Sequence, residues 1–221
     1  MSLDIEAGLR KRFPGLRVIA GCVDGVRVER SSLELERFKE ELLRDVKEKY
    51  TLDSLKDVPV FRAYRDFFWK VGIDPTKVRP AAEALIRRIL AGKPIPSINS
   101  VVDSYNLASI RTEIALAAFN REELAGSLLM RTARKGERFL GIGMGEPMNL
   151  KGVEVVISDQ EKLVAVYPYR DAERSKVSDT TRSLLILACG VPGIDESVLM
   201  DAKKTALDFI TRFCDGNIAM P

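Results

Sequence analysis

The chain has 221 residues, which is long enough to bury a sizeable core without disulfides or metals. Its 46% hydrophobic and 30% charged residues are typical of a globular protein and not of a disordered or fibrous one. The sequence contains no histidine, which excludes a Ser-His-Asp triad, a Cys-His dyad and a histidine metal site. Acid-base chemistry would therefore depend on Asp, Glu, Lys, Tyr, a perturbed Cys or groups of the substrate.

The net charge of +3 permits contact with nucleic acid but does not require it. Cys22, Cys189 and Cys214 are far apart in the chain, so they predict neither a zinc knuckle nor a disulfide framework. They favour a reducing cytoplasm. The N-terminus lacks a signal-peptide core, and no apolar run reaches the length of a membrane span. We expect a cytoplasmic protein with no membrane partner, no cofactor and no metal.

The first part of the chain is rich in helical patterns. Leu3–Phe13 has helical spacing up to Pro14, and residues 16–28 read as a strand interrupted by Asp24 and Gly25. Amphipathic spacing then predicts three helices. They cover residues 32–50, residues 60–72 up to Gly72, and residues 78–90.

After residues 92–96 the chain changes to short apolar runs separated by glycines, which predict strands. A final amphipathic helix is expected over residues 195–213. Neither part could form a core alone, so we expect one compact α+β domain. Residues 1–92 would be its helix-rich N-terminal part and residues 93–221 its main core.

The glycine-rich segment GIGMGE superficially resembles a dinucleotide-binding loop. Such a loop opens directly into a helix, whereas here Pro147 and further strand patterns follow. The segment is therefore interpreted as a β-turn.

Residues 94–120 place polar side chains in an apolar, helix-like stretch. Asn99, Asp103 and Asn106 recur at helical spacing, with Tyr105 beside them, and could hold an amino or amide group in a cleft. Asp103 is also a candidate catalytic carboxylate. The alternative is that these residues cap the helix or stabilise neighbouring loops.

A second polar segment, Tyr167–Thr181, lies between two apolar runs and is expected at a sheet edge. Asp171 is the candidate base or orienting group, and Tyr169 and Arg170 are candidate substrate ligands. Arg174 and Lys176 are candidate RNA ligands. The alternative is a solvated loop, which would not explain two tyrosines flanking a proline.

In these segments the sequence resembles the B3/B4 domain of the phenylalanyl-tRNA synthetase β subunit, which hydrolyses tyrosine mistakenly attached to phenylalanine tRNA. The resemblance rests on NSVVDSYN, AAFNREELAGSLLMRTARKGERF, VVISD, VAVYPYRD and SKVSDTTRSLLILACG. It covers about the C-terminal two thirds of the chain. It implies a three-layer β/β/α sandwich, with the N-terminal helices as found in free-standing proteins of this type.

The resemblance also implies an editing pocket. The pocket positions of the synthetase fall on Tyr105, Asn106, Ala117, Pro168 and Leu187, and only Asn106 keeps the family's residue type. Leu187 replaces the glutamate that recognises the tyrosine hydroxyl, and loss of a buried hydrogen-bonding partner usually removes discrimination.

Three functions therefore stay open. The first is hydrolysis of a mischarged aminoacyl-tRNA in trans, with tRNA and not DNA as the partner. The second is a non-catalytic RNA-binding module, and the third is a pocket for a free amino acid or small metabolite.

Overall fold

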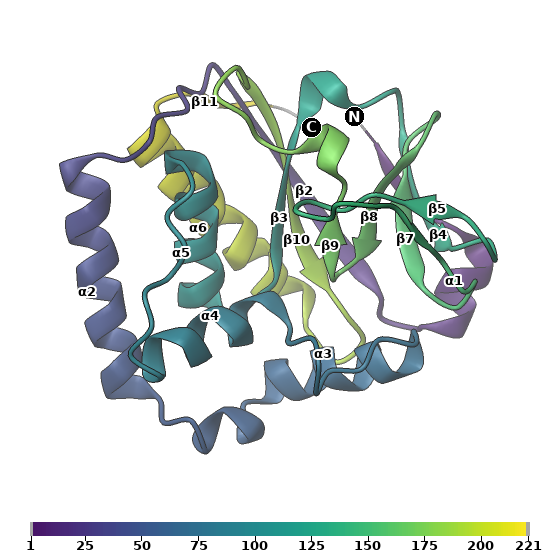
Figure 1. The fold of residues 1–221 in the computed structure, drawn as a ribbon, viewed down its shortest axis with the longest axis horizontal. Coiled ribbons are helices and arrows are strands. Elements are labelled where there is room, and N and C mark those ends of the chain that lie inside the picture. The colour runs from purple at the N-terminus through teal and green to yellow at the C-terminus, as the bar shows by residue number, and fades with distance from the viewer. Residues whose placement is uncertain (1, 220–221) are drawn as a thin grey trace.

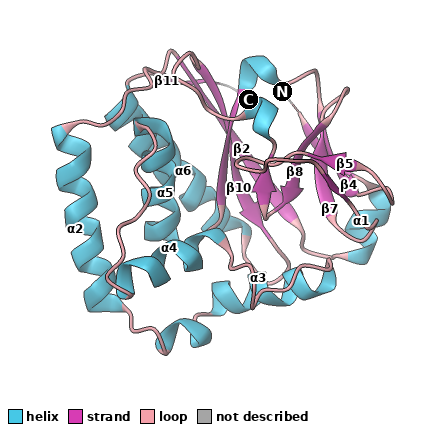
Figure 2. Ribbon diagram, in the orientation of Figure 1, coloured by secondary structure: helices cyan, strands magenta, loops and turns pink. Residues whose placement is uncertain are grey.

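The computed structural model describes residues 2–219 as an α+β structure with two main sheets and a group of helices (Figures 1 and 2). The helices are α1 (Ala7–Arg12), α2 (Leu33–Lys49), α3 (Pro59–Lys70), α4 (Ala81–Leu90), α5 (Ser100–Thr112) and α6 (Glu196–Cys214). The strands are β1 (Leu3–Ile5), β2 (Arg17–Asp24), β3 (Leu116–Asn120), β4 (Leu128–Thr132), β5 (Arg138–Phe139), β6 (Met148–Asn149), β7 (Val155–Ser158), β8 (Leu163–Tyr167), β9 (Arg170–Asp171), β10 (Ser183–Gly190) and β11 (Asn217–Ala219).

The main sheets form two of the three layers. One sheet has the strand order β1-β4-β7-β8-β9, and the other has the order β11-β2-β10-β3. Helix α6 packs along β2 and β10, and α5 packs against α6, so helices cover one side of the four-stranded sheet (Figure 1). The expected β/β/α arrangement is confirmed.

Both main sheets contribute apolar side chains to the principal core, and β10 is buried on both faces because α6 covers the side opposite the other sheet. Leu187 of β10 and Ala165 of β8 belong to this core. A second apolar cluster lies among α2, α4 and α5, where Leu35, Ile86 and Ile110 are almost fully buried. This second cluster explains the amphipathic stripe of α2.

Most of the predicted helices form close to their expected positions. Helix α2 begins after Ser32, whose hydroxyl accepts a hydrogen bond from the backbone N–H of Leu35. Helix α3 ends before Gly72, which has a positive φ of 76°. Helix α4 begins at Ala81 and not at residue 78, because Pro80 is its N-cap and disfavours helical backbone at the preceding Arg79.

Two predictions of helix are wrong. Leu3–Ile5 forms β1 and pairs in parallel with Leu128–Met130 of β4. Residues 116–120 form β3, the edge strand beside β10, and do not extend the preceding helix. In both cases pairing with a distant strand decides the backbone conformation. Local spacing contains no information about that partner.

The glycine-rich segment that follows β5 forms the turn toward β6, as interpreted from the sequence. Gly143 in this turn has a positive φ of 75°, which suits a glycine. No helix within residues 2–219 is both long enough and apolar enough to cross a membrane.

Candidate active site

A cavity of about 240 Å³ lies where the two main sheets face each other. The five-stranded sheet contributes Ile157 and Ala165, which are paired across β7 and β8. The four-stranded sheet contributes Ala117 and Leu187, which are paired across β3 and β10. These four side chains give the cavity an apolar wall on both sides.

The register of β9 decides which of two neighbouring charged residues faces the cavity. Asp171 lies opposite Ala165, and Arg170 lies opposite Val166. Opposed residues of an antiparallel pair share one face of the sheet. Ala165 belongs to the principal core, and Val166 belongs to the cluster on the other face. Asp171 therefore projects into the space between the sheets, whereas Arg170 starts from the opposite face of its sheet and borders the cavity near Ile142.

Burial changes the acidity of Asp171. Its removal from bulk water raises the pKa of the carboxyl to about 7. The residue is partly exposed because it borders the open space of the cavity. Its charge also raises the pKa of the Tyr105 hydroxyl and of the Cys189 thiol, after the larger effect of their own burial. A carboxyl that titrates near neutral pH is suited to general acid-base catalysis.

Helix α5 places two further polar side chains at the cavity. Tyr105 and Asn106 both line it and are partly exposed. Within residues 2–219, the side chains of Tyr105, Asn106 and Asp171 have no hydrogen-bond partner. None of the three is fully buried, so a ligand in the cavity can reach them. A carboxyl, a phenol and an amide are thus free to bind a ligand.

The expected common face of Asn99, Asp103 and Asn106 does not form. Asn99 is the N-cap of α5, and its side-chain oxygen accepts a hydrogen bond from Val102. Asp103 is buried away from the cavity, where it accepts hydrogen bonds from Lys39 Nζ at 3.0 Å and from Ser97 Oγ at 3.1 Å. Both side chains therefore stabilise the start of α5, as the alternative interpretation of this segment expected.

Arg170 borders the cavity, but its guanidinium group is already engaged. It donates a hydrogen bond of 2.8 Å to the carbonyl of Ile142 and lies over the ring of Tyr169 at 5.1 Å. A side chain on Gly141 would clash with the Arg170 stem, which explains the glycine there. Arg170 thus holds the 141–145 turn against the cavity. Tyr169 lines the cavity beside it.

The two candidate RNA ligands also have partners in the structure. Arg174 forms an ion pair with the buried carboxylate of Asp159 and donates to the carbonyl of Glu123. Lys176 pairs with Glu173, three residues earlier, and is exposed. The solvated-loop interpretation fits Lys176, whereas Arg174 connects the loop to the five-stranded sheet.

Sequence reasoning missed several residues of the site. Cys189 lines the cavity from β10, Ile142 from the glycine-rich turn and Ala81 from the start of α4. The alternation of the SLLILACG run could have placed Leu187 and Cys189 on one face. Nothing local links Ile142 or Ala81 to that face. In the part of the chain that the structure describes, no three Cys, Asp or Glu side chains are grouped as a metal site.

The family model described as "B3/4 domain" matches residues 63–216, well over half of the chain. The chain belongs to the B3/4 domain family. Residues 1–62 lie outside the match, although they supply β1 and β2 to the two main sheets.

Several similar proteins are phenylalanine–tRNA ligase β subunits. The subunit of Aquifex aeolicus is 34% identical over 92 residues, which cover 42% of this chain and 12% of the relative. The subunit of Bartonella henselae is 31% identical over 109 residues, covering 49% and 12%. The matches thus span about an eighth of these relatives.

A solved structure with the same fold is an N-terminal fragment of the phenylalanyl-tRNA synthetase β subunit from Pyrococcus horikoshii. The comparison covers 98% of this chain and 50% of the fragment, with a TM-score of 0.52 and 15% sequence identity. This likeness extends over β1, β2 and the N-terminal helices as well as the family-matched region.

The B3/4 resemblance also assigned five residues to a pocket. All five line the cavity between the sheets: Tyr105, Asn106, Ala117, Pro168 and Leu187. The residues that the resemblance assigned to a pocket thus line one cavity in this structure, and Asp171 is an acidic residue in its lining.

Proposed function

We propose that this B3/4 protein hydrolyses the ester bond of a mischarged aminoacyl-tRNA in trans. The observation that supports the proposal best is the unpaired Asp171 carboxyl, with a pKa of about 7, inside the cavity at the family's pocket position. The relatives are named as ligases for phenylalanine and tRNA, which makes an aminoacyl-tRNA the natural ligand class to test. The three buried free cysteines are compatible with a cytoplasmic location for this reaction.

In the proposed reaction Asp171 acts as the general base. Its carboxylate removes a proton from a water molecule as the water attacks the ester carbonyl. The bond between the carbonyl carbon and the ribose oxygen then breaks, and the proton passes to the leaving oxygen of the tRNA. The products are the free amino acid and uncharged tRNA. Tyr105 and Asn106, which also line the cavity, would donate hydrogen bonds to the polar groups of the aminoacyl ester.

The apolar walls limit the side chain that would fit. Leu187 and Ala117 stand where the resemblance implies a glutamate and a histidine, so this pocket has no carboxylate at that position to accept a bond from a phenol hydroxyl. We therefore infer a substrate amino acid other than tyrosine. Its side chain would pack between the sheets while its polar groups meet Asp171.

The experiment is a deacylation panel with tRNAs charged with each standard amino acid. We expect the protein to accelerate loss of at least one ester, and we expect Asp171→Asn to lower that rate at least about 100-fold. Asp179→Asn, an exposed aspartate in the same segment, is the matched control and should keep full activity. If no ester is lost faster than in buffer, the hydrolase proposal is wrong.

A non-catalytic RNA-binding module is the second candidate, favoured by the apolar replacements Ala117 and Leu187. It predicts tRNA binding that weakens with salt, without any accelerated deacylation. The third candidate, a pocket for a free amino acid or small metabolite, predicts ligand binding that is nearly insensitive to salt and no affinity for tRNA.

A further inference from the structure

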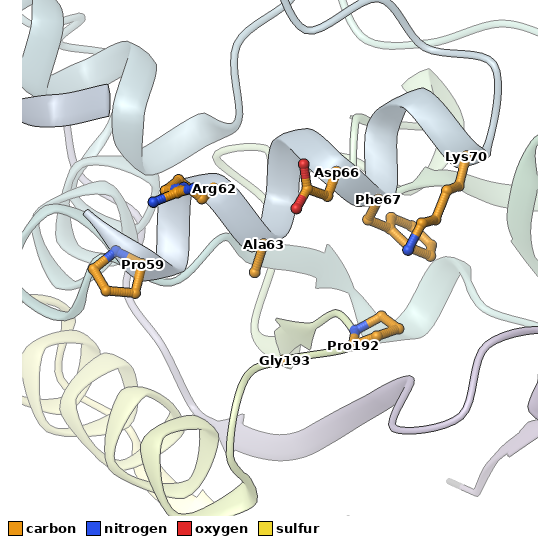
Figure 3. Close-up of a pocket in the computed structure, with 8 residues that line it drawn as sticks. All are labelled: Pro59, Arg62, Ala63, Asp66, Phe67, Lys70, Pro192 and Gly193. Carbon is orange, nitrogen blue, oxygen red and sulfur yellow. The ribbon is translucent and has the colours of Figure 1, made fainter. Parts of the chain in front are cut away.

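A second hollow lies outside the candidate active site, along the exposed side of α3. It has a volume of about 380 Å³ and is bordered by α3 on one side and by the turn at Pro192 and Gly193 on the other (Figure 3). Arg62, Asp66 and Lys70 line it from the helix. The spacing of four residues places these three on one stripe of α3.

The two cations of this stripe have no partner within residues 2–219. Neither Arg62 nor Lys70 forms a side-chain ion pair or hydrogen bond there, and both side chains are exposed. Arg65 of the same helix is different, because it pairs with the buried carboxylate of Glu83. The two cations of α3 that line the hollow are thus unpaired within the described residues, although Asp66 lies between them on the stripe.

Helix α1 brings more positive charge to the same surface. Arg12 donates a hydrogen bond of 3.1 Å to the carbonyl of Lys70, and the rings of Phe13 and Phe67 pack at 5.1 Å. The end of α1 is therefore fixed against the end of α3. The exposed cations Arg12, Arg62 and Lys70, with Asp66 beside them, form what we call the α1–α3 surface. One acidic residue against three cations leaves an excess of positive charge on this surface.

An aromatic side chain accompanies these cations. Trp69, the single tryptophan of the chain, lies next to Lys70 and is 58% exposed. Trp69 is seven positions after Arg62, about two helical turns, so the two side chains project in nearly the same direction from the helix. Exposed cations combined with a flat aromatic ring are typical of surfaces that bind nucleic-acid backbone and stack bases.

We propose that the α1–α3 surface binds the phosphate backbone of RNA and that Trp69 stacks on a base. The proposal rests on the proposed function, which makes tRNA the ligand class. An acidic protein would also complement the cations, but it would not need an exposed tryptophan beside them.

Helix α3 connects this surface to the cavity wall. The hydroxyl of Tyr64 donates to the carbonyl of Cys189 at 2.5 Å and accepts from the backbone N–H of Ala115 at 3.0 Å. Cys189 and Ala115 both line the cavity. An RNA held on the outer side of α3 would therefore lie on the helix that supports the candidate active site.

The test is a titration with uncharged tRNA, monitored by the fluorescence of Trp69. Uncharged tRNA separates binding from ester hydrolysis, so a failure here is distinct from a failure of the deacylation panel. We expect the tRNA to quench Trp69, and the R62Q/K70Q variant to bind more weakly. Its slope of log affinity against log salt should fall in magnitude by about 1.5 to 2.

The control is R44Q/K47Q, which removes the same charge from exposed positions on α2 (Figure 1). It should bind tRNA nearly as the unchanged protein does. Trp69→Ala, followed by anisotropy of labelled tRNA, should weaken binding at least about fivefold through lost stacking. Equal losses in the α2 and α3 double variants would mean a general charge effect and would overturn the proposal. The proposal would also be overturned if the protein did not bind tRNA, or if it bound an acidic protein instead.

Discussion

The ammonium group of Lys39 lies 3.0 Å from the carboxylate of Asp103. Both side chains are buried between α2 and α5, and the carboxylate also accepts a hydrogen bond from the backbone N–H of Ile98. This pair joins the N-terminal helices to the helix that carries Tyr105 and Asn106. The pair explains why the Asp103 carboxylate, three residues before Asn106 in the same helix, does not reach the cavity.

Removing one partner of this pair should destabilise the fold. We expect Lys39→Met to lower the free energy of unfolding by about 3 to 5 kcal/mol, because it leaves a buried carboxylate without its cation. Urea unfolding measures this change. Ligand binding per folded molecule should stay the same. A variant that keeps its stability but loses ligand binding would instead return Asp103 to the functional site.

The raised pKa of Asp171 predicts a pH dependence of stability. The carboxyl titrates near pH 7 in the folded protein and near pH 4 in the unfolded chain, so the folded state binds more protons between these values. The contribution of this residue to stability is therefore greatest below pH 4 and is lost as the pH rises to 7.

The substitution Asp171→Asn removes the ionisable carboxyl and therefore removes the loss of stability as the pH rises. We expect the variant to be more stable than the unchanged protein at pH 8, by up to about 4 kcal/mol, and to differ less at pH 4. Urea unfolding at the two pH values measures the effect. A variant that is equally destabilised at both values would show that the carboxyl has a purely structural role.

Arg174→Gln should affect acid stability more than RNA binding. Against the effect of its burial, backbone N–H donors of Lys162 and Ala125 and then the Arg174 guanidinium lower the pKa of Asp159 to about 2. The resulting stabilisation is present above pH 4 and is lost as the pH falls toward 2. The variant should therefore lose about 1 to 2 kcal/mol at pH 7 and less at pH 2.

The same variant tests Arg174 as an RNA ligand. We expect its salt slope for tRNA binding to stay unchanged, since the guanidinium is already paired. Lys176→Gln is the comparison, because this lysine is exposed and its partner Glu173 is only three residues away. A slope that falls by about one in Arg174→Gln alone would assign that arginine to the RNA interface.

Filling the cavity should abolish ligand binding without unfolding the protein. Ala117 lines the open space, so in Ala117→Leu the added methyl groups would occupy the cavity. We expect no deacylation and a melting temperature within a few degrees of the original. Ala91→Leu, at an exposed position after α4, is the control. Full activity in Ala117→Leu would place the reaction elsewhere.

The local features that follow from the sequence are those that depend on near neighbours in the chain. The amphipathic stripe of α2 and the glycine-rich turn after β5 form as expected, because helical spacing and positive φ act within a few residues. Strand β1 does not follow from its own residues. Its conformation depends on pairing with β4, more than a hundred residues away.

The sequence by itself also determined which segments supply polar residues to the cavity, since Tyr105, Asn106 and Asp171 come from the two polar stretches it singles out. Only the tertiary structure decided which side chains face the cavity. The register of β9 against β8 turns Asp171 inward and Arg170 outward, and a shift of one residue would exchange them. Lys39 of α2 likewise pairs with Asp103 of α5 and holds that carboxylate away from the cavity. Both outcomes depend on long-range packing, which the local pattern does not encode.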